Sequence, residues 1–299
     1  MTTNDPQIKL PTNPVNPLQK YIREDRLPNV WCAGCGIGTL LNSTANAIHE
    51  LQLDLDKLVM ISGIGCSGRF GGYFESDGFH TTHGRAIPLA TGVKLTNPNL
   101  EVVVVSGDGD LFAIGGNHFI HAARRNIDMT VICLNNLNYG MTGGQLGPTS
   151  PNLSLTSTSK FGNLEHPFNL VQLAAGAGAV YVARWTTYHV KQLQRAIKNG
   201  IQKKGFSFIE VVAPCLIYYE RYNAMSTPVE LMRRLKDIST VSRSQDPKDA
   251  IMDYPNQIVC GEFVNIEKPE YTSQMEALIK KVRKLHEDKK LGRLARRKE

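Results

Sequence analysis

The sequence predicts a doubly wound α/β fold with a mainly parallel sheet. Five short apolar runs alternate with stretches whose apolar residues recur at helical spacing. The runs are apolar on both faces rather than at alternate positions only, which is typical of strands in a parallel sheet that helices cover on both faces. Polar or glycine-rich turns follow several of the runs, at the edge where open parallel sheets bind their ligands.

The first half of this domain alternates twice between helix and strand. Residues 39–51 (TLLNSTANAIHEL) carry apolar side chains at helical spacing, and the apolar run 57–62 (KLVMIS) follows as a strand. The glycine-rich stretch 68–85 is expected to be a loop, because glycine weakens helices and strands. A helix over 86–96 then leads to the strand 101–106 (EVVVVS).

The second half continues the alternation and contains one long loop. A helix over 112–125 leads to the strand 129–134 (MTVICL), and residues 142–169 are a polar loop. A loop of this length in a compact domain indicates a functional role. The remaining expected elements are a helix over 169–178, a strand over 180–184, a helix over 189–203 and a strand over 206–214.

The chain is expected to have three parts. Residues 1–27 form an N-terminal arm, since the prolines at positions 6, 11, 14 and 17 prevent a continuous helix. Residues 28–219 form the α/β domain, and residues 220–299 form a C-terminal extension with a basic tail. We interpret the tail as a solvated helix and loose end, with an acidic partner as the alternative. Because no aromatic residues alternate with its basic ones, we expect no nucleic-acid partner.

The composition is that of a soluble globular protein. Of the 299 residues, 41% are hydrophobic and 20% are charged. The polar N-terminus lacks the apolar core of a signal peptide, and no apolar run is long enough to cross a membrane. We therefore expect a cytoplasmic protein without a membrane partner, whose six cysteines are metal ligands, catalytic groups or core residues.

Oxygen-bearing side chains follow two of the expected strands. Asp108 lies in the motif GDG after one strand, and Asn136 lies in the motif NN after the next. Carboxylate and amide oxygens suit Mg²⁺, which keeps phosphate or water in its other positions. Gly107 and Gly109 let the backbone approach a phosphate closely. GDG alone usually means a tight turn, but GDG followed by NN at strand ends indicates a magnesium and phosphate site.

Four cysteines are expected at the same edge of the sheet. Cys32 and Cys35 stand in WCAGC, while Cys66 and Cys215 each follow a strand. Four thiolates suit either a tetrahedral zinc ion or a 4Fe–4S cluster. Zinc ribbons usually carry two close pairs, and here one pair is joined by two distant cysteines, which favours the cluster. The other two cysteines, Cys133 and Cys260, lie within apolar runs and are expected to be core residues.

The stretch from GDGDLFAIGG to NNLNYGMTGGQ, residues 107–145, resembles the diphosphate-binding domain of thiamine diphosphate enzymes. This resemblance implies that the domain binds thiamine diphosphate. It also implies that the side chains of Asp108 and Asn136 and the main-chain carbonyl of Asn138 bind Mg²⁺. The cofactor contacts that it implies are Gly109, Asp110, Gly140 and Met141.

Together with this domain, WCAGCGIG, GIGCSGR and the late Cys215 resemble the β subunit of the 2-oxoacid:ferredoxin oxidoreductases over about residues 21–219. The resemblance implies that one 4Fe–4S cluster is bound by Cys32, Cys35, Cys66 and Cys215. It further implies that the thiamine site is lined by Ile64, Gly65, Ser67 and His83.

The activity implied by this family is a reversible, coenzyme A-dependent oxidative decarboxylation of a 2-oxoacid. Electrons pass through the cluster to ferredoxin, and the reverse reaction is a carboxylation. The loop MTGGQ resembles the branch in which 2-oxoglutarate enzymes are common, so we expect conversion of 2-oxoglutarate to succinyl-CoA and CO₂, with pyruvate or branched-chain 2-oxoacids as alternatives. Thr142 and Gln145 are candidate residues of the substrate loop.

The resemblance also implies a partner chain. Thiamine enzymes use a glutamate from a pyrimidine-binding domain, which the family supplies on an α subunit. We expect an (αβ)2 assembly in which this chain alone is inactive. Two other function classes compete with this interpretation. A non-redox thiamine carboligase or decarboxylase would leave the four cysteines unused, and a non-enzymatic metal-binding protein would leave the magnesium and diphosphate ligands unused.

Overall fold

The computed structural model describes residues 16–223 and 227–295, with side chains as far as residue 287. Residues 1–15, which make up most of the expected N-terminal arm, and the end of the expected basic tail lie outside the described residues. The rest of the arm contains two short 3-10 helices, η1 (Gln19–Tyr21) and η2 (Glu24–Arg26).

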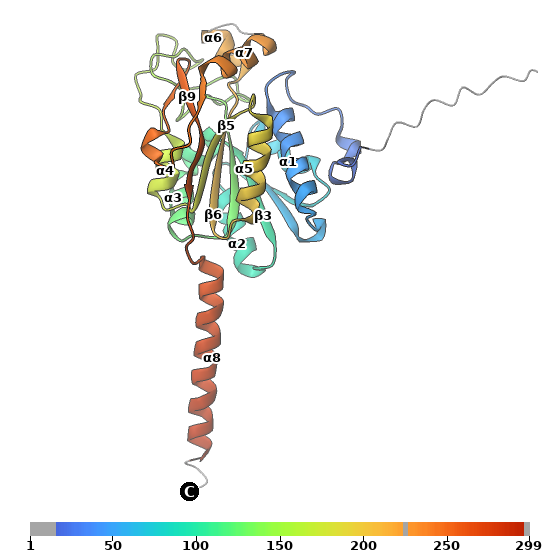
Figure 1. Ribbon diagram of the computed structural model, residues 1–299, viewed down its shortest axis with the longest axis vertical. Coiled ribbons are helices and arrows are strands. Elements are labelled where there is room, and N and C mark those ends of the chain that lie inside the picture. Colours follow the sequence, from blue (N-terminus) through green and yellow to red (C-terminus); the bar gives the residue numbers. More distant parts are fainter. Residues whose placement is uncertain (1–15, 224–226, 296–299) are drawn as a thin grey trace, which may run out of the picture.

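A nine-stranded sheet forms the centre of the molecule (Figure 1). The strand order is β2-β1-β3-β4-β6-β5-β9-β7, and β8 pairs with β9. The six strands from β2 to β5 are parallel to one another, whereas β9 runs antiparallel to β5. The bounds are β1 (Leu58–Ser62), β2 (Asp77–His80), β3 (Glu101–Gly107), β4 (Met129–Asn135), β5 (Tyr181–Thr186), β6 (Phe206–Val212), β7 (Ser239–Val241), β8 (Met252–Asp253) and β9 (Gln257–Asn265).

Helices cover both faces of the sheet, which confirms the predicted doubly wound class (Figure 1). One face packs against α1 and α5, and the other against α2, α3 and α4. The α-helices are α1 (Ile37–Leu51), α2 (Ala86–Thr96), α3 (Gly116–Arg124), α4 (Leu170–Gly176), α5 (Val190–Gln202), α6 (Arg221–Asn223), α7 (Pro228–Ile238) and α8 (Tyr271–Ala295). Short helical turns complete the chain: η3 (Leu55–Lys57), η4 (Ser67–Tyr73), the π-helical η5 (Asp110–Ile114) and η6 (Leu216–Glu220), and η7 (Pro247–Asp249).

The apolar character of the central strands follows from this double cover. Every residue of β4 and of β6 is buried, because neighbouring side chains point alternately into the two cores. Ile132 belongs to the core beneath α1 and α5, and Val131 to the core beneath α2 and α3. Cys133 and Cys260 are fully buried in these cores, as expected for packing residues.

Two segments differ from the elements expected from the sequence. The stretch 68–85 is not only loop: η4 is followed by β2, an exposed edge strand that pairs with β1. The segment beyond Tyr219 is also part of the sheet, because β9 adds to it beside β5. The Arg184 guanidinium on β5 reinforces this attachment by donating to the carbonyls of Ala250 and Ile251, at 3.0 Å each.

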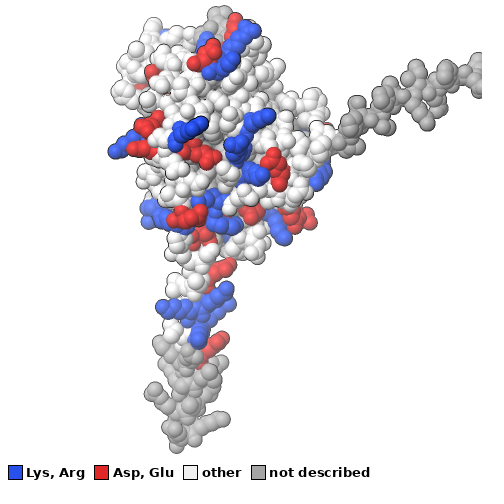
Figure 2. Space-filling model, viewed as in Figure 1, with Lys and Arg blue, Asp and Glu red and all other residues white. Residues whose placement is uncertain are grey.

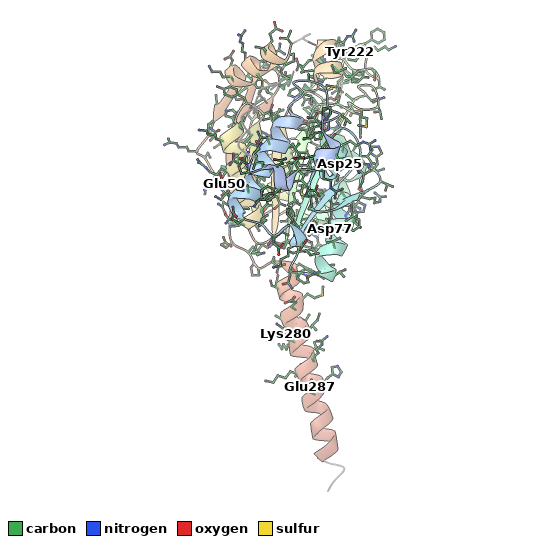
Figure 3. The ribbon with its side chains drawn as sticks, turned by 90° about the vertical axis from the view of Figure 1, so that its right-hand side faces the viewer. Asp25, Glu50, Asp77, Tyr222, Lys280 and Glu287 are labelled. Carbon is green, nitrogen blue, oxygen red and sulfur yellow. The ribbon has the colours of Figure 1, made fainter. Side chains whose placement is uncertain are left out.

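The C-terminal helix α8 extends away from the sheet (Figure 1). Basic residues gather on its first half (Figure 2), and Lys280 and Glu287 are labelled in its middle part in Figure 3. None of the described helices combines the length and the apolar character that a membrane crossing requires.

Candidate functional site

The sequence-predicted residues meet at the carboxyl ends of β1, β3 and β4, around one cavity. We call it the cofactor cavity. It contains every implied thiamine or magnesium residue, together with Thr142 of the substrate loop. Its lining is Ile64, Gly65, Cys66, Ser67, His83, Gly107, Asp108, Gly109, Asp110, Asn136, Asn138, Tyr139, Gly140, Met141 and Thr142.

Three oxygen atoms converge on one point of this cavity. The side-chain oxygen of Asn136 lies 2.6 Å from the carbonyl oxygen of Asn138 and 3.0 Å from a carboxylate oxygen of Asp108. Without a cation, this amide would be better turned over, so that its nitrogen donates to both neighbours. With a cation between them, the three oxygens are a ligand set of the hard type that Mg²⁺ prefers. Leu137 makes the convergence possible, because its left-handed backbone (φ 68°) reverses the chain between the two asparagines.

Two further observations fit a bound cation and diphosphate. Burial raises the pKa of Asp108 to about 6, although a hydrogen bond from Thr149 opposes the shift. Both polar atoms of the Asn138 side chain are buried without a hydrogen-bond partner among the described residues. Unpaired buried polar atoms are costly, which indicates that a polar ligand completes this site.

Asp110 forms several hydrogen bonds in another part of the cofactor cavity. Its Oδ1 lies 2.9 Å from His83 Nδ1 and accepts a hydrogen bond of 2.8 Å from the Gly84 N–H. Its Oδ2 accepts a hydrogen bond of 2.7 Å from the Ser106 hydroxyl. Both carboxylate oxygens are thus occupied by groups of this chain, and Asp110 holds the half-exposed His83 ring at the cavity.

Four cysteines line a second cavity at the same edge, which we call the cysteine cavity. The pair Cys32 and Cys35 lies on the loop before α1, Cys66 follows β1, and Cys215 follows β6. Its full lining is Trp31, Cys32, Cys35, Ile37, Cys66, Leu134, Asn136, Ala213, Cys215, Leu216 and Ile217. The loop turns tightly around the pair at Gly34 (φ 80°) and Gly36 (φ 86°), and Trp31 Nε1 donates to the Cys66 carbonyl at 2.8 Å.

The donor set of this cavity limits which metal group fits. The metal-ligating side chains of its lining are four cysteine thiols. Four thiolates suit either a 4Fe–4S cluster or a tetrahedral zinc ion. Burial raises the pKa of Cys66 to about 11, with smaller contributions from the three neighbouring thiols, so a bound metal cation would be needed to hold Cys66 as a thiolate.

The two cavities are in contact. Cys66 and Asn136 line both of them. A methyl group built on Gly140 would lie 3.4 Å from the Cys215 sulfur, so the loop that closes the cofactor cavity also touches the cysteine cavity. A redox centre in one cavity would therefore lie next to a cofactor in the other.

Hydrogen bonds within the expected substrate loop link Thr142 to Gln145. The Thr142 hydroxyl donates to Gln145 Oε1 at 2.6 Å, and Gln145 Nε2 donates to the Thr142 carbonyl at 2.7 Å. Thr142 lines the cofactor cavity, but Gln145 is not among its lining residues.

Sequence reasoning missed three residues at this edge. Tyr139 lines the cofactor cavity, and a Cβ on Gly109 would stand 2.4 Å from its ring. Thr149 donates to the Asp108 carboxylate from the long polar loop. Trp31, adjacent to the cysteine pair, lines the cysteine cavity. Tyr139 and Trp31 stand within motifs that the sequence analysis quotes. Thr149 stands in the long polar loop, and its contact with Asp108 cannot be predicted from the local sequence.

The chain is similar to several known proteins. Residues 63–211 match the family "Thiamine pyrophosphate enzyme, C-terminal TPP binding domain". The chain is 50% identical over 270 residues to the 2-oxoglutarate synthase subunit KorB of Methanocaldococcus jannaschii, covering 90% of this chain and 99% of that protein. It is 45% identical over 188 residues to the subunit beta of 2-oxoacid:ferredoxin oxidoreductase 2 from Aeropyrum pernix, covering 63% and 61%.

A solved structure is similar over nearly the whole fold. It is the 2-oxoglutarate:ferredoxin oxidoreductase from Magnetococcus marinus with 2-oxoglutarate, coenzyme A and succinyl-CoA bound. The match has a TM-score of 0.77 and 30% sequence identity, and it covers 89% of this chain and 90% of the other.

Proposed function

The chain belongs to the family of 2-oxoglutarate synthase KorB subunits, the β subunits of 2-oxoacid:ferredoxin oxidoreductases, and from this premise we propose that it oxidises 2-oxoglutarate together with an α subunit. The carboxylate next to the keto group leaves as CO₂. The acyl carbon forms a bond to the sulfur of coenzyme A, whose thiol proton passes to solvent. The two electrons released reduce two ferredoxin molecules in turn, and the reaction is reversible.

One observation carries this proposal: the cofactor cavity and the cysteine cavity share Cys66 and Asn136. A non-redox thiamine enzyme has no use for four cysteines beside its cofactor. A reaction that removes electrons one at a time would need an acceptor beside the cofactor.

Three groups complete the proposed site. Thiamine diphosphate supplies a carbon nucleophile and an electron sink when it is bound. Asp108, Asn136 and the carbonyl of Asn138 would hold Mg²⁺ against its diphosphate, and the four cysteines would hold one 4Fe–4S cluster.

The residues of this chain would then act by positioning the cofactor and the substrate. Asp110 keeps His83 at the cofactor cavity, where the ring would contact the cofactor. Ile64, Gly65, Ser67, Gly109, Gly140 and Met141 would surround the thiamine. Thr142 would contact the substrate from the loop, and the hydrogen bonds of Gln145 would hold Thr142 in place.

The partner chain supplies what this chain lacks. We propose that an α subunit carries the pyrimidine-binding domain with its activating glutamate, that the assembly is (αβ)2, and that it works in the cytoplasm, where the six free cysteines stay reduced.

Anaerobic co-expression with the α subunit tests the proposal. We expect reduction of ferredoxin or viologen that requires both coenzyme A and 2-oxoglutarate, with pyruvate and branched-chain 2-oxoacids slower. Purified complex that contains zinc without iron, or that reduces no acceptor with any 2-oxoacid, would contradict the proposed function. This chain purified alone is the control and should be inactive.

A further inference from the structure

Residues 227–254 contact two of the three stretches that carry the cysteines of the cysteine cavity, and we call them the clamp segment. The segment contains α7, β7, η7 and β8, and it lies beyond residues 63–211, which match the thiamine family. Its helix α7 lies at the end of the molecule opposite α8 (Figure 1), where Tyr222 on α6 is labelled in Figure 3.

The first contact is made at the loop of the cysteine pair. Pro228 lies so close to Gly34 that a Cβ built on this glycine would stand 2.3 Å from the Pro228 Cβ. Gly34 also has a left-handed backbone (φ 80°), so this position of the loop accepts only glycine without strain. Pro228 is fixed in turn as the first residue of α7, which Thr227 and Glu230 begin with a capping box. The start of α7 therefore packs directly on the loop between the two cysteines of the pair.

The second contact is made at the turn that follows Cys215. The Glu220 N–H donates to the Cys215 carbonyl at 2.9 Å and closes η6. The Glu220 side chain is fully buried, and it accepts a hydrogen bond of 2.8 Å from Arg234 Nη1 and another from the Tyr254 hydroxyl. The Tyr254 ring also packs edge-on against Tyr219 of the same turn, with ring centroids 5.9 Å apart. Two residues of the clamp segment thus hold the residue that closes the turn.

The buried carboxylate makes the position of this turn depend on the clamp segment. A buried charge that loses its partner is costly, so Glu220 is held where Arg234 and Tyr254 reach it. At its other end the turn is anchored to the sheet, because the Cys215 N–H donates to the Asn136 carbonyl at 3.1 Å. The Cys215 side chain is half-buried, so a movement of the clamp segment would change its exposure.

We propose that the clamp segment holds the cysteine cavity closed, with Arg234 and Tyr254 as positioning residues for Cys215 and with Pro228 as the contact for the cysteine pair. This part of the inference concerns the thiols of the chain itself. A second part rests on the proposed function: in the αβ complex the clamp segment slows the loss of the iron–sulfur cluster, because residues that orient metal ligands contribute to metal affinity.

The variant Tyr254→Phe tests the first part in the full-length, metal-free chain, since it removes only one hydroxyl. We expect iodoacetamide to alkylate Cys215 about tenfold faster than in the unmodified chain, as measured site by site by mass spectrometry. Losing one hydrogen bond to a charged group favours local opening by about this factor. Arg234→Gln removes the other partner of Glu220 and should act in the same direction.

Tyr181→Phe is the matched control. The Tyr181 hydroxyl also donates to a glutamate, Glu262, at 2.9 Å, and the ring is fully buried, but Tyr181 lines neither the cofactor cavity nor the cysteine cavity. This variant should leave the alkylation rate of Cys215 unchanged. Circular dichroism of each variant checks that the fold is retained.

The αβ complex, purified anaerobically, tests the second part. We expect Tyr254→Phe to release iron to a chelator about tenfold faster than the unmodified complex, within the range found when partners of metal ligands are removed. The electron paramagnetic resonance signal of the reduced cluster should also change in Tyr254→Phe and stay the same in Tyr181→Phe.

The clamp proposal is overturned if Cys215 reacts equally fast in the unmodified chain and in both Tyr254→Phe and Arg234→Gln. It is also overturned if Tyr181→Phe accelerates the reaction as much as Tyr254→Phe does, because the effect would then be a general loss of stability. A complex without iron, in a chain whose Cys215 reactivity follows the prediction, would contradict the proposed function alone. Iron bound in the unmodified complex, together with equal Cys215 reactivity in all variants, would contradict the clamp alone.

Discussion

Asp108 has an environment that is unfavourable for a charged carboxylate in the absence of a ligand. It is fully buried, its pKa is raised to about 6 by that burial, and its carboxylate faces the side-chain oxygen of Asn136 at 3.0 Å. Such an arrangement is unfavourable unless something positive lies between the oxygens. Asp108 is therefore the residue through which the proposed Mg²⁺ would most affect the binding of a diphosphate.

We predict that Asp108→Ala weakens the binding of thiamine diphosphate by about a hundredfold in the presence of Mg²⁺, since even outer-sphere changes at metal sites cost about 10–100-fold. Thr149→Val, which removes only the hydrogen bond to Asp108, should have a smaller effect. Calorimetric titration of the cofactor into the αβ complex measures both. Unchanged affinity in Asp108→Ala would show that the oxygens do not bind the metal.

The cysteines divide into two groups by position. Cys215 lines the cysteine cavity, whereas Cys260 is fully buried in the core. We predict that Cys215→Ser abolishes iron binding and acceptor reduction, and that Cys260→Ala retains both. Iron and sulfide analysis with visible absorption checks this prediction. Equal iron content in the two variants would remove Cys215 from the cluster.

At the scale of elements, the strand ends carry the site and one buried ion pair holds three strands in register. Arg184 on β5 donates to Glu210 on β6 at 2.7 Å, and both side chains are fully buried. Glu210 also accepts a hydrogen bond of 2.7 Å from Asn135 on β4, the neighbour of Asn136. The position of one proposed magnesium ligand thus depends on this ion pair.

We predict that Arg184→Leu lowers the free energy of unfolding by about 3 kcal/mol or more, because it leaves the Glu210 carboxylate buried without its partner. The double variant Arg184→Leu with Glu210→Leu should recover much of that loss. Denaturant unfolding of the cofactor-free chain measures the difference. If the single variant is as stable as the double variant, the pair is not required for the packing of β5 against β6.

The sequence predicted these elements unevenly, and the reasons are physical. Strands β1, β3, β4 and β6 carry apolar residues on both faces, so their existence and the convergence of their ends could be predicted from pattern alone. The edge strand β2 is exposed at each residue and contains Gly78, so it carries no apolar signal. The attachment of β9 depends on long-range contacts such as those of Arg184, which no local pattern encodes.

The candidate site could also be predicted only in part from the sequence. The motifs predicted that Cys66, Asp108 and Asn136 lie at one edge of the sheet. The structure places them at that edge, and their roles as ligands remain predictions. The engagement of Asp110 with His83 and the Thr149 contact could not be predicted, because they depend on how loops far apart in sequence meet.

At the scale of the whole molecule, α8 stands apart from the α/β body. Leu278, Val282 and Leu285 are 59%, 43% and 50% exposed, so the outer part of this helix buries little in the isolated chain. We predict that truncation after residue 276 leaves the unfolding temperature of the chain unchanged, as measured by circular dichroism. A large decrease would mean that α8 stabilises the sheet.

We propose that a thiamine site and an iron–sulfur site lie next to each other in this chain and work as one redox unit. The most direct test is electron paramagnetic resonance of the anaerobic αβ complex mixed with 2-oxoglutarate and coenzyme A, without ferredoxin. We predict the signal of a reduced 4Fe–4S cluster in the unmodified complex and its absence in Asp108→Ala, whose cluster dithionite should still reduce. A cluster that dithionite reduces but 2-oxoglutarate with coenzyme A does not would contradict the claim.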